Sequence, residues 1–155
     1  MTDEESEWCS NLKEASRLSC EEDYDLYKQA AQRLSMSNDL EVLRTMFGCF
    51  SDVEAGEIQH ALIDACETFP DEIYVRILIS EGQTFARNSP WWFNHVIHVM
   101  LNTGTCLDVL YSCYTTLSVE KRRWLLSTVA KLAEEREKYA VIHRSLRAME
   151  EGVRG

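Results

Sequence analysis

The chain has 155 residues, of which 45 % are hydrophobic and 27 % charged, and its net charge is −10. This length and composition favour a single globular domain over residues 1–155, whose helices are derived below, and argue against extended disorder. The acidic start, MTDEESEW, lacks the basic and apolar segments of a secretory signal, and no apolar run approaches the roughly 20 residues that span a bilayer. We therefore expect a cytoplasmic protein with no membrane partner.

The predicted elements are eight or nine short helices, which makes the fold class all-α. Pro70 and Pro90 each fall in the first turn of a helix, where the missing N–H costs nothing. Residues 73–79 alternate somewhat like a strand, but helical spacing fits them equally well and the preceding proline favours a helix. Short connections predict antiparallel neighbours. The predicted helices span residues 3–18, 21–34, 38–49, 53–68, 70–86, 90–102, 105–117, 119–136 and 138–150.

One segment of the chain recurs. Residues 40–51 and 107–118 align without a gap, with Leu-Glu-Val-Leu matched by Leu-Asp-Val-Leu and an aromatic residue and a serine following at equal spacing. The offset of 67 residues is about twice 33, a typical length for one helix pair. Three such pairs predict a short, irregular solenoid of the HEAT type. A compact helical bundle is the alternative.

No catalytic or metal-binding pattern is present in the sequence. His95 and His98 stand three residues apart on one predicted helix, but no HExxH motif or Cys/His cluster supplies the further ligands that zinc needs. The chain has no GxSxG motif and no glycine-rich phosphate loop, and its paired acids lie in solvated charge runs. We therefore expect no metal, no cofactor and no enzymatic activity.

The six cysteines show no CxxC spacing. Several fall on apolar helical positions, and thiols in the cytosol are kept reduced. We expect reduced, buried or half-buried thiols rather than disulfides. They are Cys9, Cys20, Cys49, Cys66, Cys106 and Cys113.

The charge is divided unevenly along the chain. Residues 1–75 carry 18 acidic and five basic residues, a net charge of −13, whereas residues 76–155 have a net charge of +3. An acidic half repels nucleic acid and attracts a basic protein, although a solvated acidic face is the plainer interpretation. The basic run Lys121-Arg122-Arg123 is too small for strong phosphate binding, and we expect it to pair with the acidic half.

The densest aromatic feature is Trp91-Trp92-Phe93, at the start of the helix that follows Pro90. Adjacent residues of a helix point about 100° apart, so the two tryptophans cannot face the core equally. We expect one to pack inside with Val96 and the other to be partly exposed as an interface anchor. Burial of both is the alternative.

Three segments between residues 57 and 102 form a recognisable pattern. They read Glu-Ile-Gln-His-Ala-Leu-Ile from residue 57, continuing through Glu67 and Phe69 to Tyr74, then Asn-Ser-Pro-Trp-Trp at 88–92, and His-Val-Met-Leu-Asn at 98–102.

This pattern resembles the family known as Immunity protein 30, found beside polymorphic toxins and in contact-dependent growth inhibition systems. The family shows a helix ending in an acid and an aromatic, then a tyrosine, a small-residue-Pro-x-Trp helix start, and an Arg-Ile-Leu-Asn-like helix end. Here His98 replaces the arginine and Met100 the isoleucine, while Leu101 and Asn102 stand. We expect the motif residues to hold the helices together. They are Glu67, Phe69, Tyr74, Pro90, Trp91 and Asn102.

The resemblance implies a protein that binds the C-terminal toxin domain delivered by a neighbouring cell and blocks it. Many such toxins are basic nucleases, and an EndoU-like RNase is the specific candidate. An acidic surface would occlude the active site of such an enzyme. The partner-binding residues selected on charge and placement, with Trp91 or Trp92 as an apolar anchor and Trp92 preferred, are Glu21, Glu22, Asp23, Asp25, Asp52, Glu54, Glu57, Asp71, Glu72 and Trp92.

The competing hypothesis is a HEAT-like adaptor or scaffold with a housekeeping protein partner. Gene neighbourhood separates the two, because an immunity gene directly follows the gene of a large exported protein.

Overall fold

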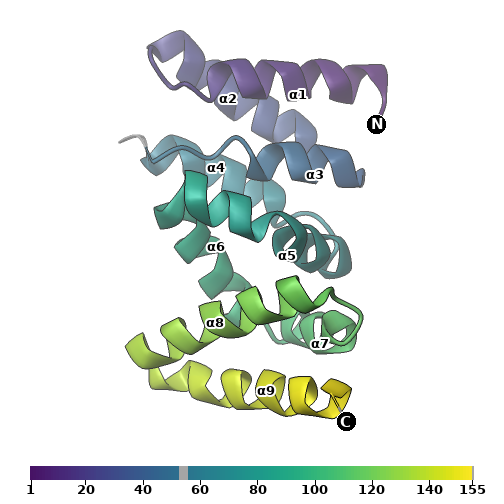
Figure 1. Cartoon of the computed structure of the whole chain (residues 1–155). Coiled ribbons are helices and arrows are strands. Elements are labelled where there is room, and N and C mark those ends of the chain that lie inside the picture. The colour runs from purple at the N-terminus through teal and green to yellow at the C-terminus, as the bar shows by residue number, and fades with distance from the viewer. Residues whose placement is uncertain (53–55, 155) are drawn as a thin grey trace. The chain divides into compact units, whose positions relative to one another are not determined.

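The computed structural model describes residues 1–52 and 56–154, and all its regular elements are helices (Figure 1). The described residues form two compact units, Met1–Val99 and Met100–Gly155. The all-α prediction is confirmed, while one domain over residues 1–155 stays a prediction. The α-helices are α1 Asp3–Ala15, α2 Glu21–Leu34, α3 Leu40–Phe47, α4 Gly56–Cys66, α5 Asp71–Asn88, α6 Pro90–Asn102, α7 Gly104–Tyr114, α8 Val119–Glu135 and α9 Ala140–Arg154, with a 3₁₀ turn at Glu137–Tyr139.

The helices of the first unit stack as pairs. Helix α1 packs on α2 and on α3, α2 also packs on α4, and α3 also packs on α4 and α5. The pairs α1–α2 and α3–α4 thus each pack internally, and they pack on each other through α1 with α3 and α2 with α4, as in a helical solenoid. Within Met1–Val99 this pattern favours the stacked-pair prediction over a plain bundle.

Helix boundaries follow local backbone chemistry. The first predicted helix reaches residue 18, but α1 ends at Ala15, because Leu18 adopts a left-handed conformation with φ of 49°. An L-residue in that region cannot continue a right-handed helix. The side chain of Leu18 is only 4 % exposed, so its burial holds this turn in place. Pro90 is the first residue of α6, and Pro70 directly precedes α5, as their fixed φ predicts.

An aromatic chain forms the core between α3, α5 and α6. The ring of Phe85 lies 5.5 Å from that of Phe47 and 5.2 Å from that of Phe50, measured between centroids, and Phe50 stacks on Trp92 at 5.6 Å. Offset aromatic pairs at such distances add to the burial of apolar surface. These contacts fix how the start of α6 sits against α3.

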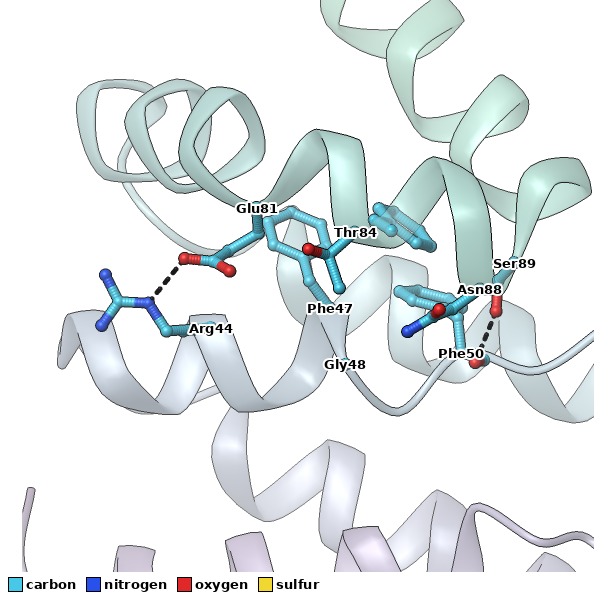
Figure 2. A pocket seen from close by; sticks show the side chains of 9 residues that line it. Arg44, Phe47, Gly48, Phe50, Glu81, Thr84, Asn88 and Ser89 are labelled. Atoms are coloured by element: carbon cyan, nitrogen blue, oxygen red, sulfur yellow. Dashed lines mark hydrogen bonds and ion pairs between the residues drawn. The ribbon is translucent and has the colours of Figure 1, made fainter. Parts of the chain in front are cut away.

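A small pocket opens beside this core, between α3 and α5 (Figure 2). Phe47 and Phe50 form its floor, and Thr84 and Asn88 line its side. The charged side chains that line it, Arg44 and Glu81, pair with each other, with Nε of Arg44 2.9 Å from Glu81 Oε1. The pocket is therefore an apolar hollow closed at one end by an ion pair.

In the second unit, α9 packs on α8 and on α7. Ser118 caps α8 by accepting a hydrogen bond from the Lys121 amide, the role that serine plays at helix N-termini. Asn102 donates to the Tyr139 hydroxyl at 3.0 Å and accepts from the Lys138 ammonium at 2.7 Å, which connects the end of α6 with the 3₁₀ turn.

The basic run at the start of α8 does not pair as the sequence suggested. Arg122 is buried and its Nε donates to Glu150 of α9 at 2.7 Å, while its Nη1 donates to the Leu117 carbonyl at 2.7 Å. The partner carboxylate thus comes from the basic half of the chain and not from the acidic half. The sequence separation of 28 residues hid this pairing, because only the packing of α8 on α9 brings the two side chains together.

The recurring segments fall on α3 and α7. Leu43 and Leu110 are both fully buried, as are Phe47 and Tyr114 to within 2 %. The repeated leucine and aromatic positions are therefore the residues that α3 and α7 bury.

All six cysteines are free thiols, and burial raises the pKa of Cys9, Cys49 and Cys66, that of Cys49 to about 12. Cys20 alone is exposed, so the expectation of buried or half-buried thiols is wrong for it. We expect one thiol to react rapidly with Ellman's reagent at pH 8 and the others only on unfolding. Fast reaction of two or more thiols in the native protein would contradict this burial.

The same thiols predict the direction of a pH effect. In the unfolded chain a cysteine ionises near pH 8.5, whereas buried Cys49 keeps its proton to about pH 12. Above about pH 8.5 the unfolded state therefore binds fewer protons than the folded state, and stability falls as the pH rises towards 12.

Candidate partner-binding surface

The turns of the first unit gather on two opposite edges. On one, Ser89 Oγ donates to the Phe50 carbonyl at 2.7 Å and Trp92 Nε1 donates to the Ser51 carbonyl at 2.9 Å, which joins the α3–α4 turn to the start of α6. We call this the Trp91 edge, formed by turn residues 48–52 and 89 and the first turns of α2, α4 and α6. Helices α1, α3 and α5 end there, as Figure 1 shows.

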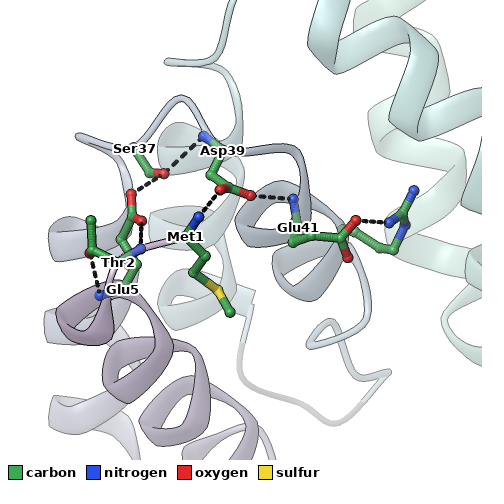
Figure 3. A network of polar contacts seen from close by, with 7 residues as sticks. Met1, Thr2, Glu5, Ser37, Asp39 and Glu41 are labelled. Carbon is green, nitrogen blue, oxygen red and sulfur yellow. Dashed lines mark hydrogen bonds and ion pairs between the residues drawn. The ribbon is translucent and has the colours of Figure 1, made fainter.

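The opposite edge holds the N-terminus and the turns at residues 35–39 and 67–70, and we call it the Asp39 edge. Figure 3 shows its polar network, in which the Met1 amino group pairs with Asp39 and the Ser37 hydroxyl donates to Glu5 at 2.5 Å. Thr2 and Glu5 form a capping box at the start of α1. These contacts place the starts of α1 and α3 side by side.

The predicted acids divide between the two edges. Those at the starts of α2 and α4 lie on the Trp91 edge, whereas Asp71 and Glu72 begin α5 on the Asp39 edge. Glu54 lies outside the described residues. The predicted acids on the Trp91 edge are Glu21, Glu22, Asp23, Asp25, Asp52 and Glu57.

Three of the predicted acids already have partners within the chain, and one of them is Glu22, which accepts a hydrogen bond from the Cys20 thiol. The Ser19 hydroxyl and amide donate to Asp23 at 2.6 and 2.8 Å, and these hydrogen bonds lower the pKa of the Asp23 carboxyl. Glu72 pairs with Arg76 at 3.0 Å, one turn along α5. Glu21, Asp25, Asp52 and Glu57 are exposed.

Four rings from α4 and α6 form a cluster at the Trp91 edge. Trp91 packs edge-on against Trp92 with centroids 4.4 Å apart and stacks on His95 at 6.1 Å, with an interplanar angle of 18°. His60 of α4 packs edge-on against both Trp92 and His95. We call His60, Trp91, Trp92 and His95 the ring cluster.

The two tryptophans of the cluster have opposite environments. Trp92 is 2 % exposed, and Trp91 is 58 % exposed. The prediction that one packs inside while the other is exposed is confirmed, but the choice of Trp92 as the surface anchor is corrected to Trp91. Trp92 is buried because its ring stacks on Phe50 and its N–H reaches the α3–α4 turn. Of the motif residues, Phe69 and Tyr74 are buried as expected, whereas Trp91 is a surface residue.

One acid of α4, Asp64, was missed from the sequence. Glu57, His60 and Asp64 of α4 and Glu67 directly after it follow one another at helical spacings of three and four, which places them along one side. Burial and the charge of Asp64 raise the pKa of Glu67, and His95 of α6 opposes this. The i, i+3, i+7, i+10 spacing in the sequence could have revealed that these residues share one side. With Asp64 included, the exposed acids continue along α4 beyond His60.

The described residues contain no group of three or more histidine, cysteine, aspartate or glutamate side chains that could hold a metal ion. They also contain no helix long and apolar enough to cross a membrane.

Exposed acids on α2 and α4 and an exposed tryptophan at the start of α6 are features of a surface that binds another protein. The model of the family described as Immunity protein 30 matches residues 14–110, and the chain belongs to that family. It is thus an immunity protein directed against a cognate toxin. No curated protein and no solved structure matches the chain. The matched residues include the whole ring cluster and the acidic face of α4.

Proposed function

We propose that this chain neutralises a basic nuclease toxin, delivered by contact-dependent growth inhibition, by covering the active site of the nuclease with the acidic surface of its first unit. The observation that carries the proposal is the concentration of exposed carboxylates on α2 and α4, in a half of the chain with a net charge of −13. Family membership supplies the toxin as partner.

The proposed mechanism is electrostatic and steric. A nuclease holds the phosphates of its substrate with lysine and arginine side chains. Carboxylates presented from the first turns of α2 and α4 offer the same side chains an alternative anion. Complementary charge also speeds association, which matters for an inhibitor that must bind before the nuclease reaches RNA or DNA. We propose that inhibition takes place in the cytoplasm, where the delivered nuclease meets its substrate.

The partner surface that we propose is the Trp91 edge together with the exposed face of α4. An interface of ordinary size covers about 800 Å² on each partner, enough to span the first turns of two neighbouring helices. An EndoU-like RNase stays our specific candidate for the toxin. Asp71 and Glu72 also stay proposed contacts, from the opposite edge.

The direct test is inhibition of the toxin domain encoded immediately upstream of the gene. We expect one equivalent of the protein to abolish cleavage of RNA or DNA by that domain, and co-expression to rescue cells from it and from no unrelated toxin. Full nuclease activity of the upstream domain in a mixture with the purified protein would contradict the proposal.

Charge-neutralising variants show which edge meets the toxin. Glu21→Gln with Glu57→Gln removes two first-turn acids from the Trp91 edge, and Asp71→Asn with Glu72→Gln removes two from the Asp39 edge. We expect the first pair to slow association by about fivefold at low salt, with the effect shrinking in 0.5 M salt, and the second to change it less. Stopped-flow kinetics measure this, and equal effects would refute the preference for the Trp91 edge.

A further inference from the structure

The exposed ring of Trp91 is held in place before any partner arrives. Its inner side packs edge-on against buried Trp92, and His95, one turn further along α6, stacks against it. His60 of α4 contacts both supporting rings, so the support comes from two helices. A large side chain fixed in this way loses little rotational freedom on binding, which is the property of an interface anchor.

The α4 side of the ring cluster carries exposed acids. His60 of the ring cluster lies on the α4 face that carries Glu57 one turn before it and Asp64 one turn after it. Glu67 follows on the same side directly after α4, and burial and the charge of Asp64 raise the pKa of its carboxyl while His95 acts in the opposite direction. On the side of α5 and α6, the exposed residues near Trp91 in sequence include the uncharged Pro90 and Asn94 and the cation Arg87 in the last turn of α5.

We propose that the ring cluster is the anchor of the partner interface and that the exposed face of Trp91 receives a lysine or arginine side chain of the toxin. The proposal rests on the proposed function, since it names what the toxin presents to this surface. A cation over the face of a tryptophan is attracted by the ring electrons, and tryptophan is the best of the aromatic residues for this contact. The carboxylates of Glu57 and Asp64, which flank His60 on α4, then attract this basic side chain of the toxin or basic side chains next to it.

Substitutions of Trp91 test the anchor against the toxin domain encoded upstream, inactivated at its catalytic residue. We expect Trp91→Ala to weaken binding by at least about thirtyfold, the fold-change of an interface hot spot. We expect Trp91→Phe to lose less than Trp91→Met, because phenylalanine keeps an aromatic face and methionine keeps only apolar bulk. Leu40→Ala is the matched control, since Leu40 is 47 % exposed and lies on the Asp39 edge.

A spectroscopic readout separates contact from folding. In protein labelled with fluorotryptophan, the ¹⁹F resonance of Trp91 is assigned by its loss in Trp91→Phe, and it is expected to shift when the toxin domain is added. Thermal unfolding confirms that each variant is folded. Because more than half of the Trp91 side chain is exposed, we expect its substitutions to leave the unfolding temperature nearly unchanged.

The outcomes are distinct. Tight binding by the wild type together with equally tight binding by Trp91→Ala overturns the anchor and leaves the proposed function standing. Equal binding by Trp91→Phe and Trp91→Met contradicts the contact with a basic side chain. It would mean that Trp91 inserts into an apolar pocket on the toxin. If the wild type does not bind the upstream domain at all, the proposed function and the anchor fail together.

Discussion

Trp92→Ala is expected to lower the unfolding temperature by about 10–15 °C. Removal of a buried tryptophan side chain costs about 3–5 kcal/mol, and a protein of this size loses about 2–4 °C for each kcal/mol. Trp92 is 2 % exposed, stacks on Phe50, and joins α6 to the α3–α4 turn through its bond to the Ser51 carbonyl. Its loss therefore leaves a cavity and frees that turn.

Circular dichroism during heating measures this effect, with Trp91→Ala as the matched control. The two residues are neighbours of the same type, and they differ in whether the ring faces the core or solvent. We expect the control to unfold within about 3 °C of the wild type, since exposed substitutions change stability by about 0.5 kcal/mol or less. Similar losses in both variants would show that the two rings are not placed as described.

Glu150→Ala is expected to destabilise the second unit by about 3–5 kcal/mol. The side chains of Arg122 and Glu150 are 8 % and 6 % exposed, and their ion pair joins α8 to α9. Removal of one member leaves the other charge buried without its main partner, which costs far more than the pair itself contributes. Urea unfolding and amide hydrogen exchange of α9 measure the loss.

The double variant Arg122→Met with Glu150→Leu is the control for this interpretation. Two apolar side chains of similar size avoid the buried charge, so we expect the double variant to recover at least half of the stability that Glu150→Ala loses. Arg122 also donates to the Leu117 carbonyl, and this bond is not restored. A double variant less stable than Glu150→Ala would mean that the pair itself stabilises the fold.

Much of the helical map follows from the sequence. Pro90 marks the start of α6, and the apolar spacing around Leu43 and Phe47 marks the face that α3 buries. The end of α1 could not be placed, because the left-handed turn at Leu18 depends on tertiary burial of a side chain that has no preference for that conformation.

The surface was harder to predict than the helices. Helical spacing shows that Trp91 and Trp92 differ in direction, but which of them faces inward depends on where Phe50 and Ser51 lie, and those residues belong to a distant turn. The division of the predicted acids between the two edges could partly be predicted from the sequence. In a chain of antiparallel helices, alternate helices begin on the same edge, so α2 and α4 share an edge and α5 begins on the other.

The α3–α4 turn is held through its main chain, by the Trp92 bond described above and by Gln59 of α4. The fully buried amide of Gln59 accepts from the Ser51 N–H at 2.7 Å and donates to the Ser51 carbonyl at 2.6 Å. These two hydrogen bonds involve only the main chain of Ser51. A surface residue next to it, such as Asp52, can therefore be substituted without breaking them. If the toxin binds at this edge as proposed, point substitutions of such residues can change recognition while the hydrogen bonds that hold the turn stay in place.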